Sequence, residues 1–136
     1  MTMLTGLLCL FLAGAQPAKK GDYVYSLKSF EGKKNVLAVF APSKKDSQFA
    51  KQLEVVKAQA ANLKKSQTAV FYIFESEKGR ADSAFLRVAD SEDLRKRYKV
   101  SKGAFRVLFI DKKGAVKRES QEPLAADQFS KFVSAK

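Results

Sequence analysis

The sequence predicts one α/β domain, with a mixed central sheet of about four to five strands and helices on both faces. Two apolar runs of strand length, Asn35–Ala41 and Ala69–Phe74, flank a segment with helical periodicity, which is the pattern of a parallel strand–helix–strand unit. A third apolar run, Phe105–Ile110, precedes the turn Asp111–Gly114 and the segment Ala115–Ser120, which predicts an antiparallel hairpin. Strands of both directions give a mixed sheet, and buried strands need helices on both faces.

The segment between the first two apolar runs predicts an amphipathic helix. Asp46 or Ser47 is its N-cap, and the pattern ends near Lys65. Apolar residues recur at alternating steps of four and three, which places them on one face. These residues are Phe49, Leu53, Val56, Ala60 and Leu63.

Two shorter helices are expected further along the chain. Ser91–Tyr98 begins with a capping serine and acidic residues and ends with basic residues, as the helix dipole favours. A final helix is predicted over Leu124–Ser134. The segment Tyr23–Phe30 suits either an edge strand or a turn of helix, and Glu75–Ala89 is polar without a readable period.

The first residues of the sequence form a separate apolar segment. The run Met3–Ala15 carries no charge and ends in the small-residue pattern Ala13-Gly14-Ala15. Because about 20 apolar residues are needed to span a bilayer, this shorter run predicts a secretory signal peptide cleaved after Ala15, with a buried N-terminal helix as the alternative. We therefore expect a secreted or periplasmic protein with a signal peptide over 1–15, a leader over 16–26 and a domain over 27–136.

The composition excludes several classes of active site. The 136 residues contain no histidine and one cysteine, Cys9, which lies within the predicted signal peptide. The mature domain would therefore have no thiol, no disulfide and no histidine base or metal ligand. No carboxylate pair or metal-binding spacing is present, so we expect no catalytic residue, no metal and no cofactor. The 26 basic and 14 acidic residues give a net charge of +12, which favours anionic partners.

Two segments resemble parts of thioredoxins. Residues 39–47, VFAPSKKDS, are similar to the thioredoxin strand end and active-site turn, F-W-A-x-W-C-x-x-C. Residues 98–114 resemble the thioredoxin pattern Y-x-V-x-x-x-P-T-x-x-x-F…G. More specifically, the pieces VFAPSKKD, LRKRYKV and FRVLFIDKKGAVKR resemble the DUF4174 family over about Leu27–Val133. This resemblance implies a thioredoxin-like or peroxiredoxin-like fold, and a relation to domains of animal matrix proteins of the sushi-repeat and coiled-coil-80 type. It implies no settled activity.

The chain departs from these patterns where redox chemistry would occur. The two thioredoxin cysteine positions fall on Lys44 and Ser47, and the position of the cis-proline falls on Ala104. A peroxiredoxin alignment from Pro42 places Phe49 at the reactive cysteine. Disulfide exchange requires a thiolate, so the resemblance implies a domain that has lost this chemistry.

Basic residues near the changed turn are the candidate site. Lys44 and Lys45 precede a helix N-terminus, where lysines and free N–H groups attract anions. In a thioredoxin-like fold, residues 102–106 would approach this turn. A solvated loop and exposed charged faces are the alternatives. The candidate anion- or partner-binding residues are Lys44, Lys45, Arg95, Arg97, Lys102 and Arg106.

The sequence therefore predicts an exported, non-catalytic thioredoxin-like module. Its expected partner is a protein or an anionic envelope or matrix polymer, bound through a basic face. Nucleic acid is a poor candidate because no nucleic-acid signature is present. No transmembrane segment is expected after signal cleavage. The alternatives are a thiol-independent or residual oxidoreductase or peroxiredoxin-like enzyme and a structural subunit of an envelope complex.

Overall fold

The structure is a computed structural model that describes residues 32–81 and 84–133. Its strands are β1 (Asn35–Phe40), β2 (Thr68–Ile73), β3 (Gly79–Ala81), β4 (Ala84–Leu86), β5 (Arg106–Ile110) and β6 (Val116–Ser120). Its helices are α2 (Ser47–Ala58), α3 (Ala60–Lys65), α4 (Val88–Arg97) and α5 (Ala126–Phe132). The predictions for Tyr23–Phe30, for the signal peptide and leader, and for Cys9 fall outside the described residues.

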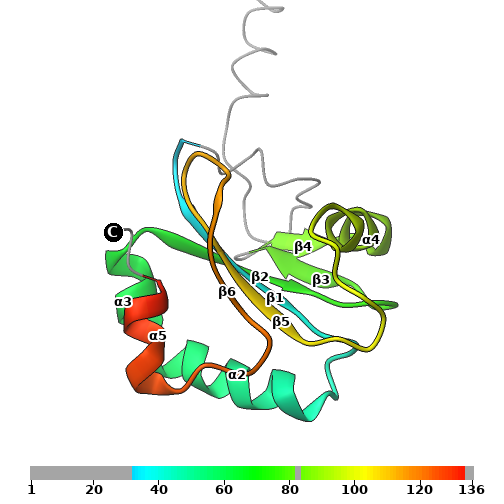
Figure 1. Cartoon of the computed structure of the whole chain (residues 1–136), viewed down its shortest axis with the longest axis horizontal. Coiled ribbons are helices and arrows are strands. Elements are labelled where there is room, and N and C mark those ends of the chain that lie inside the picture. The colour runs from blue at the N-terminus through cyan, green and yellow to red at the C-terminus, as the bar shows by residue number, and fades with distance from the viewer. Residues whose placement is uncertain (1–31, 82–83, 134–136) are drawn as a thin grey trace, which may run out of the picture.

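The strands form one mixed sheet of order β4-β3-β2-β1-β5-β6 (Figure 1). β1 pairs with β2 in parallel, and the other neighbouring pairs are antiparallel. The predicted strand–helix–strand unit and the hairpin of β5 and β6 are therefore confirmed. The sheet has six strands instead of the expected four to five.

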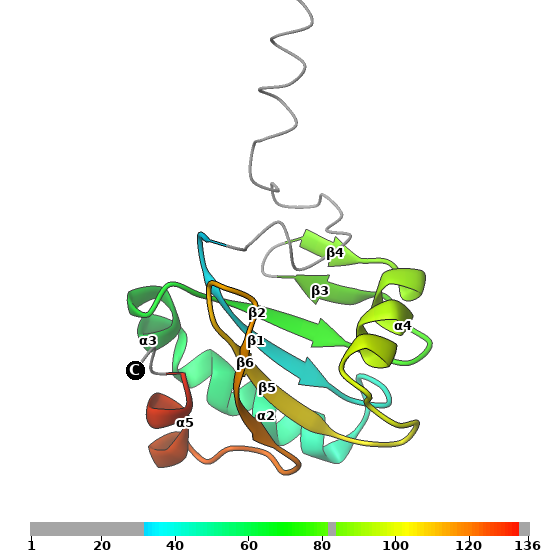
Figure 2. The same cartoon turned by 45° about the horizontal axis from the view of Figure 1, so that its top comes forward.

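Each face of the sheet has its own apolar core. Val36, Ala38 and Phe40 of β1 belong to the cluster that contains Leu94 of α4. The alternate residues of β1 belong to the cluster that contains the apolar residues of α2, α3 and α5. Figure 2 shows α4 beside β3 and β4, apart from the other three helices. Helices thus cover both faces, as predicted, and this explains why all six residues of β1 are buried.

Asp46 starts α2 as an N-cap. Its Oδ2 accepts a hydrogen bond from the backbone N–H of Phe49 at 3.0 Å. The single helix expected up to Lys65 is instead two helices, α2 and α3, which are separated at Gln59. The apolar face is only partly buried, because Ala60 is exposed at this interruption.

A polar residue that the periodicity did not identify also holds α2 in place. Gln52 is fully buried. Its Oε1 accepts a hydrogen bond from the N–H of Leu124 at 2.7 Å, and its Nε2 donates to the carbonyl of Leu124 at 3.5 Å. Both groups of the amide are thereby satisfied, as burial requires.

Two expectations were wrong between β2 and β5. The polar segment Glu75–Ala89 contains β3 and β4, which were not predicted because strands of three residues carry too little pattern. Helix α4 begins at Val88, and Ser91 is a buried residue inside it instead of its cap. Burial of Ser91 against the sheet explains the error, since a serine in a helix interior imitates a capping signal. The guanidinium of Arg87 pairs with Asp90 at 2.7 Å in the first turn.

Candidate functional site

Three loops meet beyond the carboxyl ends of β1 and β2, and we call this end of the molecule the loop face. They are residues 41–46, 74–78 and 98–105. The N–H of Glu75 donates to the carbonyl of Pro42 at 3.4 Å, and the N–H of Lys44 donates to Oε1 of Glu77 at 3.3 Å. The loop after β1 is therefore bound to the loop after β2.

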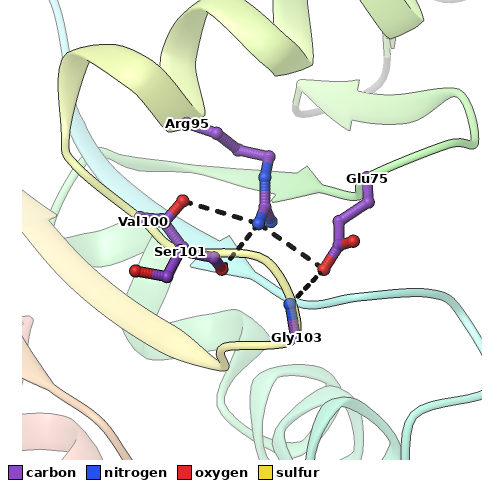
Figure 3. Close-up of polar contacts among 5 residues, drawn as sticks. All are labelled: Glu75, Arg95, Val100, Ser101 and Gly103. Atoms are coloured by element: carbon purple, nitrogen blue, oxygen red, sulfur yellow. Dashed lines mark hydrogen bonds and ion pairs between the residues drawn. The ribbon is translucent and has the colours of Figure 1, made fainter.

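A buried ion pair binds the third loop to the same place (Figure 3). Nη2 of Arg95 lies 3.5 Å from Oε2 of Glu75 and donates to the carbonyl of Ser101 at 2.7 Å. Oε2 of Glu75 also accepts the N–H of Gly103 at 2.7 Å. The side chain of Arg95 is only 8% exposed and that of Glu75 is 19% exposed, so this partly buried network fixes the path of the loop before β5.

The end of α4 contributes a strained residue to the loop face. Lys99 has φ of +56°, in the left-handed region that glycine usually occupies. The N–H of Val100 donates to the carbonyl of Arg95 at 2.9 Å, and the N–H of Lys99 donates to that of Lys96 at 3.2 Å, which is the Schellman pattern. This ending directs Lys99 and the following residues around the C-terminus of α4.

A surface hollow of about 420 Å³ lies between α4 and the loops. It is bordered by four cationic and two acidic residues, and one cation of the four, Arg95, is already paired with Glu75. Three exposed lysines are left at its rim. The lining residues are Glu75, Ser76, Glu92, Arg95, Lys96, Lys99, Val100, Ser101 and Lys102.

The structure divides the predicted site residues into two groups. Lys44, Lys45, Arg97 and Lys102 are exposed on or beside the three loops. Arg95 is 7% exposed and points inward to Glu75, so its side chain is not part of the outer surface. A guanidinium that the sequence assigned to partner binding therefore has a structural role.

Arg106 is also engaged within the fold. Its Nη1 lies 3.2 Å from Oε2 of Glu119 on β6. Arg106 is paired with Phe40 in the sheet register, and its contact runs toward β6, whereas Lys44 contacts Glu77 on the β2 side. These contacts run in opposite directions along the sheet and do not join the two residues in one pocket.

The candidate residues from the sequence omit four charged residues of the hollow: Glu75, Glu92, Lys96 and Lys99. Glu75 carried no local signal of its role, because its partners come from α4 and from the loop before β5. Lys96 and Lys99 could have been included, because they belong to the same basic stretch of sequence as the predicted Lys102.

The positions that resemble redox residues hold other side chains. Lys44 and Ser47 are exposed at the start of α2. Phe49 is buried, and its ring lies edge-on to those of Tyr72 and Phe74 at 5.4 and 4.9 Å. Within residues 32–81 and 84–133 no peptide bond is cis, including the one before Ala104. The described part of the chain contains no sulfur at this end, as the only cysteine of the sequence is Cys9.

No group of three or more acidic or cysteine side chains in the part of the chain that the structure describes could hold a metal ion. None of the helices placed there is both long enough and apolar enough to cross a membrane.

Solved structures that are similar to this chain include peroxiredoxins and a lipoprotein thioredoxin. The reduced 2-Cys peroxiredoxin of Plasmodium vivax superposes with a TM-score of 0.63 at 15% identity, over 79% of each chain. The exposed lipoprotein thioredoxin of Streptococcus pneumoniae gives a TM-score of 0.59 at 18% identity, over 79% of this chain and 87% of that one. StoA of Bacillus subtilis gives 0.56 at 12% identity, over 76% and 84%. These similarities confirm the thioredoxin-like fold.

The sequence comparisons identify a family without an assigned activity. No curated protein matches the chain. The relation to animal matrix proteins of the sushi-repeat and coiled-coil-80 type, which the sequence resemblance implies, therefore stays a prediction. The profile of the domain of unknown function DUF4174 matches residues 26–134, which is most of the sequence. The chain therefore belongs to the DUF4174 family and has a thioredoxin-like fold.

Proposed function

We propose that this domain is a non-catalytic binding module, which after export binds an acidic segment of a protein partner at the loop face. The observation that carries the proposal is the hollow beside α4, where Lys96, Lys99 and Lys102 surround a buried ion pair. These lysines are exposed and lie within reach of one bound segment. Lys44 and Lys45 extend the same basic surface along the neighbouring loop.

The Glu75–Arg95 pair supports a prepared binding site. Because Glu75 is held by Arg95 and by the N–H of Gly103, its carboxylate does not compete strongly for the rim lysines. A carboxylate from a partner can replace the water around those lysines without rearranging the loop. Loops already fixed in place lose little conformational entropy when a ligand binds.

The mixture of charges favours a protein segment over a uniform polyanion. Glu75, Glu77 and Glu92 lie among the lysines of the loop face. A polymer with a charge on every unit would meet these acids, whereas a peptide can place its acidic residues beside the lysines and neutral or basic residues beside the acids. We therefore place the polymer second.

The rival function is thiol-dependent oxidoreduction, which the peroxiredoxin and thioredoxin neighbours favour by fold. Fold similarity does not transfer chemistry. Disulfide exchange needs a sulfur at the loop face, and the positions there hold Lys44, Ser47 and Phe49. Insulin reduction and peroxide consumption by residues 16–136 should equal the uncatalysed rates. Turnover by this cysteine-free chain would contradict the proposal.

Export is the second part of the proposal and has its own test. The run Met3–Ala15 and its Ala13-Gly14-Ala15 ending support cleavage after Ala15. Protein recovered from outside the cytoplasm should begin at Gln16. Recovery of uncleaved chain from the cytoplasm alone would exclude export.

Binding is tested with two matched triple variants and a synthetic peptide in which glutamate alternates with serine, which we call the poly-glutamate peptide. The loop-face variant K96Q/K99Q/K102Q should bind the peptide about tenfold more weakly than the unaltered domain, because each exposed pair contributes about 0.5 kcal/mol. The control K64Q/K65Q/K113Q removes the same charge elsewhere and should change the affinity less than twofold. Equal losses in both variants would show that net charge alone attracts the peptide. If K96Q/K99Q/K102Q lost more affinity for heparin than for the poly-glutamate peptide, the result would favour an anionic polymer as the natural ligand of the loop face.

A further inference from the structure

We propose that the opposite end of the sheet is a second binding surface, which attaches the domain to anionic lipid headgroups. We call this surface the lysine pole and define it by Lys33, Lys64, Lys65, Lys112 and Lys113. It lies at the start of β1 and β2, whereas the loop face lies beyond their ends. It is independent of the proposed function at the loop face.

Three segments far apart in the sequence meet at the lysine pole. The N–H of Gly32 donates to the carbonyl of Lys112 at 2.7 Å, which joins the chain before β1 to the turn between β5 and β6. The N–H of Asn35 donates to the carbonyl of Gln67 at 2.9 Å, and Nζ of Lys112 donates to Oε1 of Gln67 at 2.7 Å. The segment after α3 is thereby held against the start of β1 and against the turn between β5 and β6.

The lysines border a surface hollow of about 430 Å³. Lys65, Lys112 and Lys113 line it, and Lys64 precedes Lys65 at the exposed end of α3. Asp111 is the one acidic residue of the lining. The lysine pole therefore differs from the loop face, where acidic residues lie among the cations.

The carboxylate of Asp111 is occupied within its own turn. Oδ1 accepts the N–H groups of Lys113 and Ala115, each at 2.9 Å, and Oδ2 lies 3.7 Å from Nζ of Lys117. The hydrogen bond from Ala115 is the main reason why the pKa of Asp111 lies below its ordinary value. Lys112 has a neutral amide as its partner, so its positive charge is not neutralised by that contact.

The chemistry of the surface favours lipid headgroups. The lysine pole has five ammonium groups. Clusters of about four to eight basic residues typically attract an anionic leaflet. Lysine is a compact point charge that suits mobile phosphates, whereas arginine suits fixed bidentate recognition.

The test uses residues 16–136, because both described core clusters form within residues 36–133. Sedimentation with vesicles of phosphatidylcholine containing phosphatidylglycerol should pellet the domain, and vesicles of phosphatidylcholine alone should not. Each lysine near an anionic leaflet increases binding about fivefold, so K64Q/K65Q/K113Q should weaken it on the order of 100-fold. The loop-face variant K96Q/K99Q/K102Q loses the same charge and should bind vesicles within about threefold of the unaltered domain. Circular dichroism confirms that both variants are folded.

A second pair of measurements separates the lipid from other anions. The variant K64R/K65R/K113R keeps the charge and should keep vesicle binding. Equal loss of vesicle binding in the two glutamine variants would overturn the proposal, because attraction would then follow net charge. Binding of heparin at the lysine pole without binding of anionic vesicles would also overturn it and assign the surface to a polymer. Neither outcome depends on poly-glutamate binding at the loop face.

Discussion

Both ends of the central sheet carry clusters of basic residues, but these residues have different roles at the two ends. At the loop face, Arg95 and Arg106 are paired with Glu75 and Glu119, and only part of the cationic charge faces outward. At the lysine pole, the single lining acid, Asp111, is bound by its own turn. Cations of the loop face position loops within the fold, whereas those of the lysine pole face solvent and can contact a ligand.

This difference shows that a count of charges does not locate a binding surface. The net charge of +12 is spread over residues that the fold places in different environments. Burial of Arg95 turns a cation into a structural group, whereas Lys64 and Lys65 stay exposed at the end of a short helix. The partner of each cation decides whether its charge acts inside the fold or outside it.

The largest expected effect comes from breaking the loop-face network. R95M should lower the free energy of unfolding by about 2–4 kcal/mol, because it removes the guanidinium that pairs with Glu75 and donates to the carbonyls of Val100 and Ser101. R97M changes an exposed neighbour on the same helix and should cost about 0.5 kcal/mol or less. Urea denaturation of both variants measures the difference. Equal costs would mean that Arg95 is an ordinary surface cation and that the contrast between the two ends is wrong.

Burial of Tyr72 near the loop-face end of β2 predicts a smaller effect at high pH. Desolvation raises the pKa of Tyr72 to about 12, and the nearby charge of Arg80 opposes the rise. The fold thus favours the neutral phenol of Tyr72. The resulting contribution to the free energy of unfolding is complete below the unfolded pKa of about 10 and is lost as the pH rises toward 12. The loss should be about 1–2 kcal/mol after allowance for partial exposure.

The variant Y72F isolates this contribution, because it removes the phenol and leaves every other titratable group unchanged. Only the unaltered domain should show the additional fall in urea midpoint between about pH 9 and pH 11.5. Parallel curves for the two proteins would refute the assignment to Tyr72.

The smallest effect is expected at the lysine pole. K112M removes an exposed hydrogen bond to Gln67, and unfolding should become easier by about 0.5 kcal/mol or less. The same urea measurement that detects R95M should barely detect this change. A cost above about 1 kcal/mol would mean that Lys112 positions the turn as Arg95 positions its loop, and the two ends would then be alike.

The sequence predicted those parts of the fold that depend on local pattern. The apolar runs of β1, β2 and β5 and the cap at Asp46 are local signals, and each was confirmed. Strand β3 carries no such signal, because its position depends on contact with β2. A Cβ added to Gly79 would lie 2.2 Å from the carbonyl oxygen of Tyr72, so the close approach of two strands requires glycine there.

The candidate site was predictable only in outline. Local charge identified Lys44, Lys45 and Lys102, which are exposed at the loop face. The inward position of Arg95 depends on Glu75 and Ser101, which come from other segments, and one sequence does not reveal such pairs. The lysine pole was missed for the same reason, since Gln67 and Lys112 are brought together only by the fold.

The crossed binding experiment tests the central claim most directly. Poly-glutamate and phosphatidylglycerol vesicles are each measured against K96Q/K99Q/K102Q and K64Q/K65Q/K113Q, at about 150 mM salt so that distant charges are screened. We expect the first variant to lose the peptide and keep the vesicles, and the second to lose the vesicles and keep the peptide. Equal losses of both ligands in both variants would show that the two ends are not separate binding surfaces.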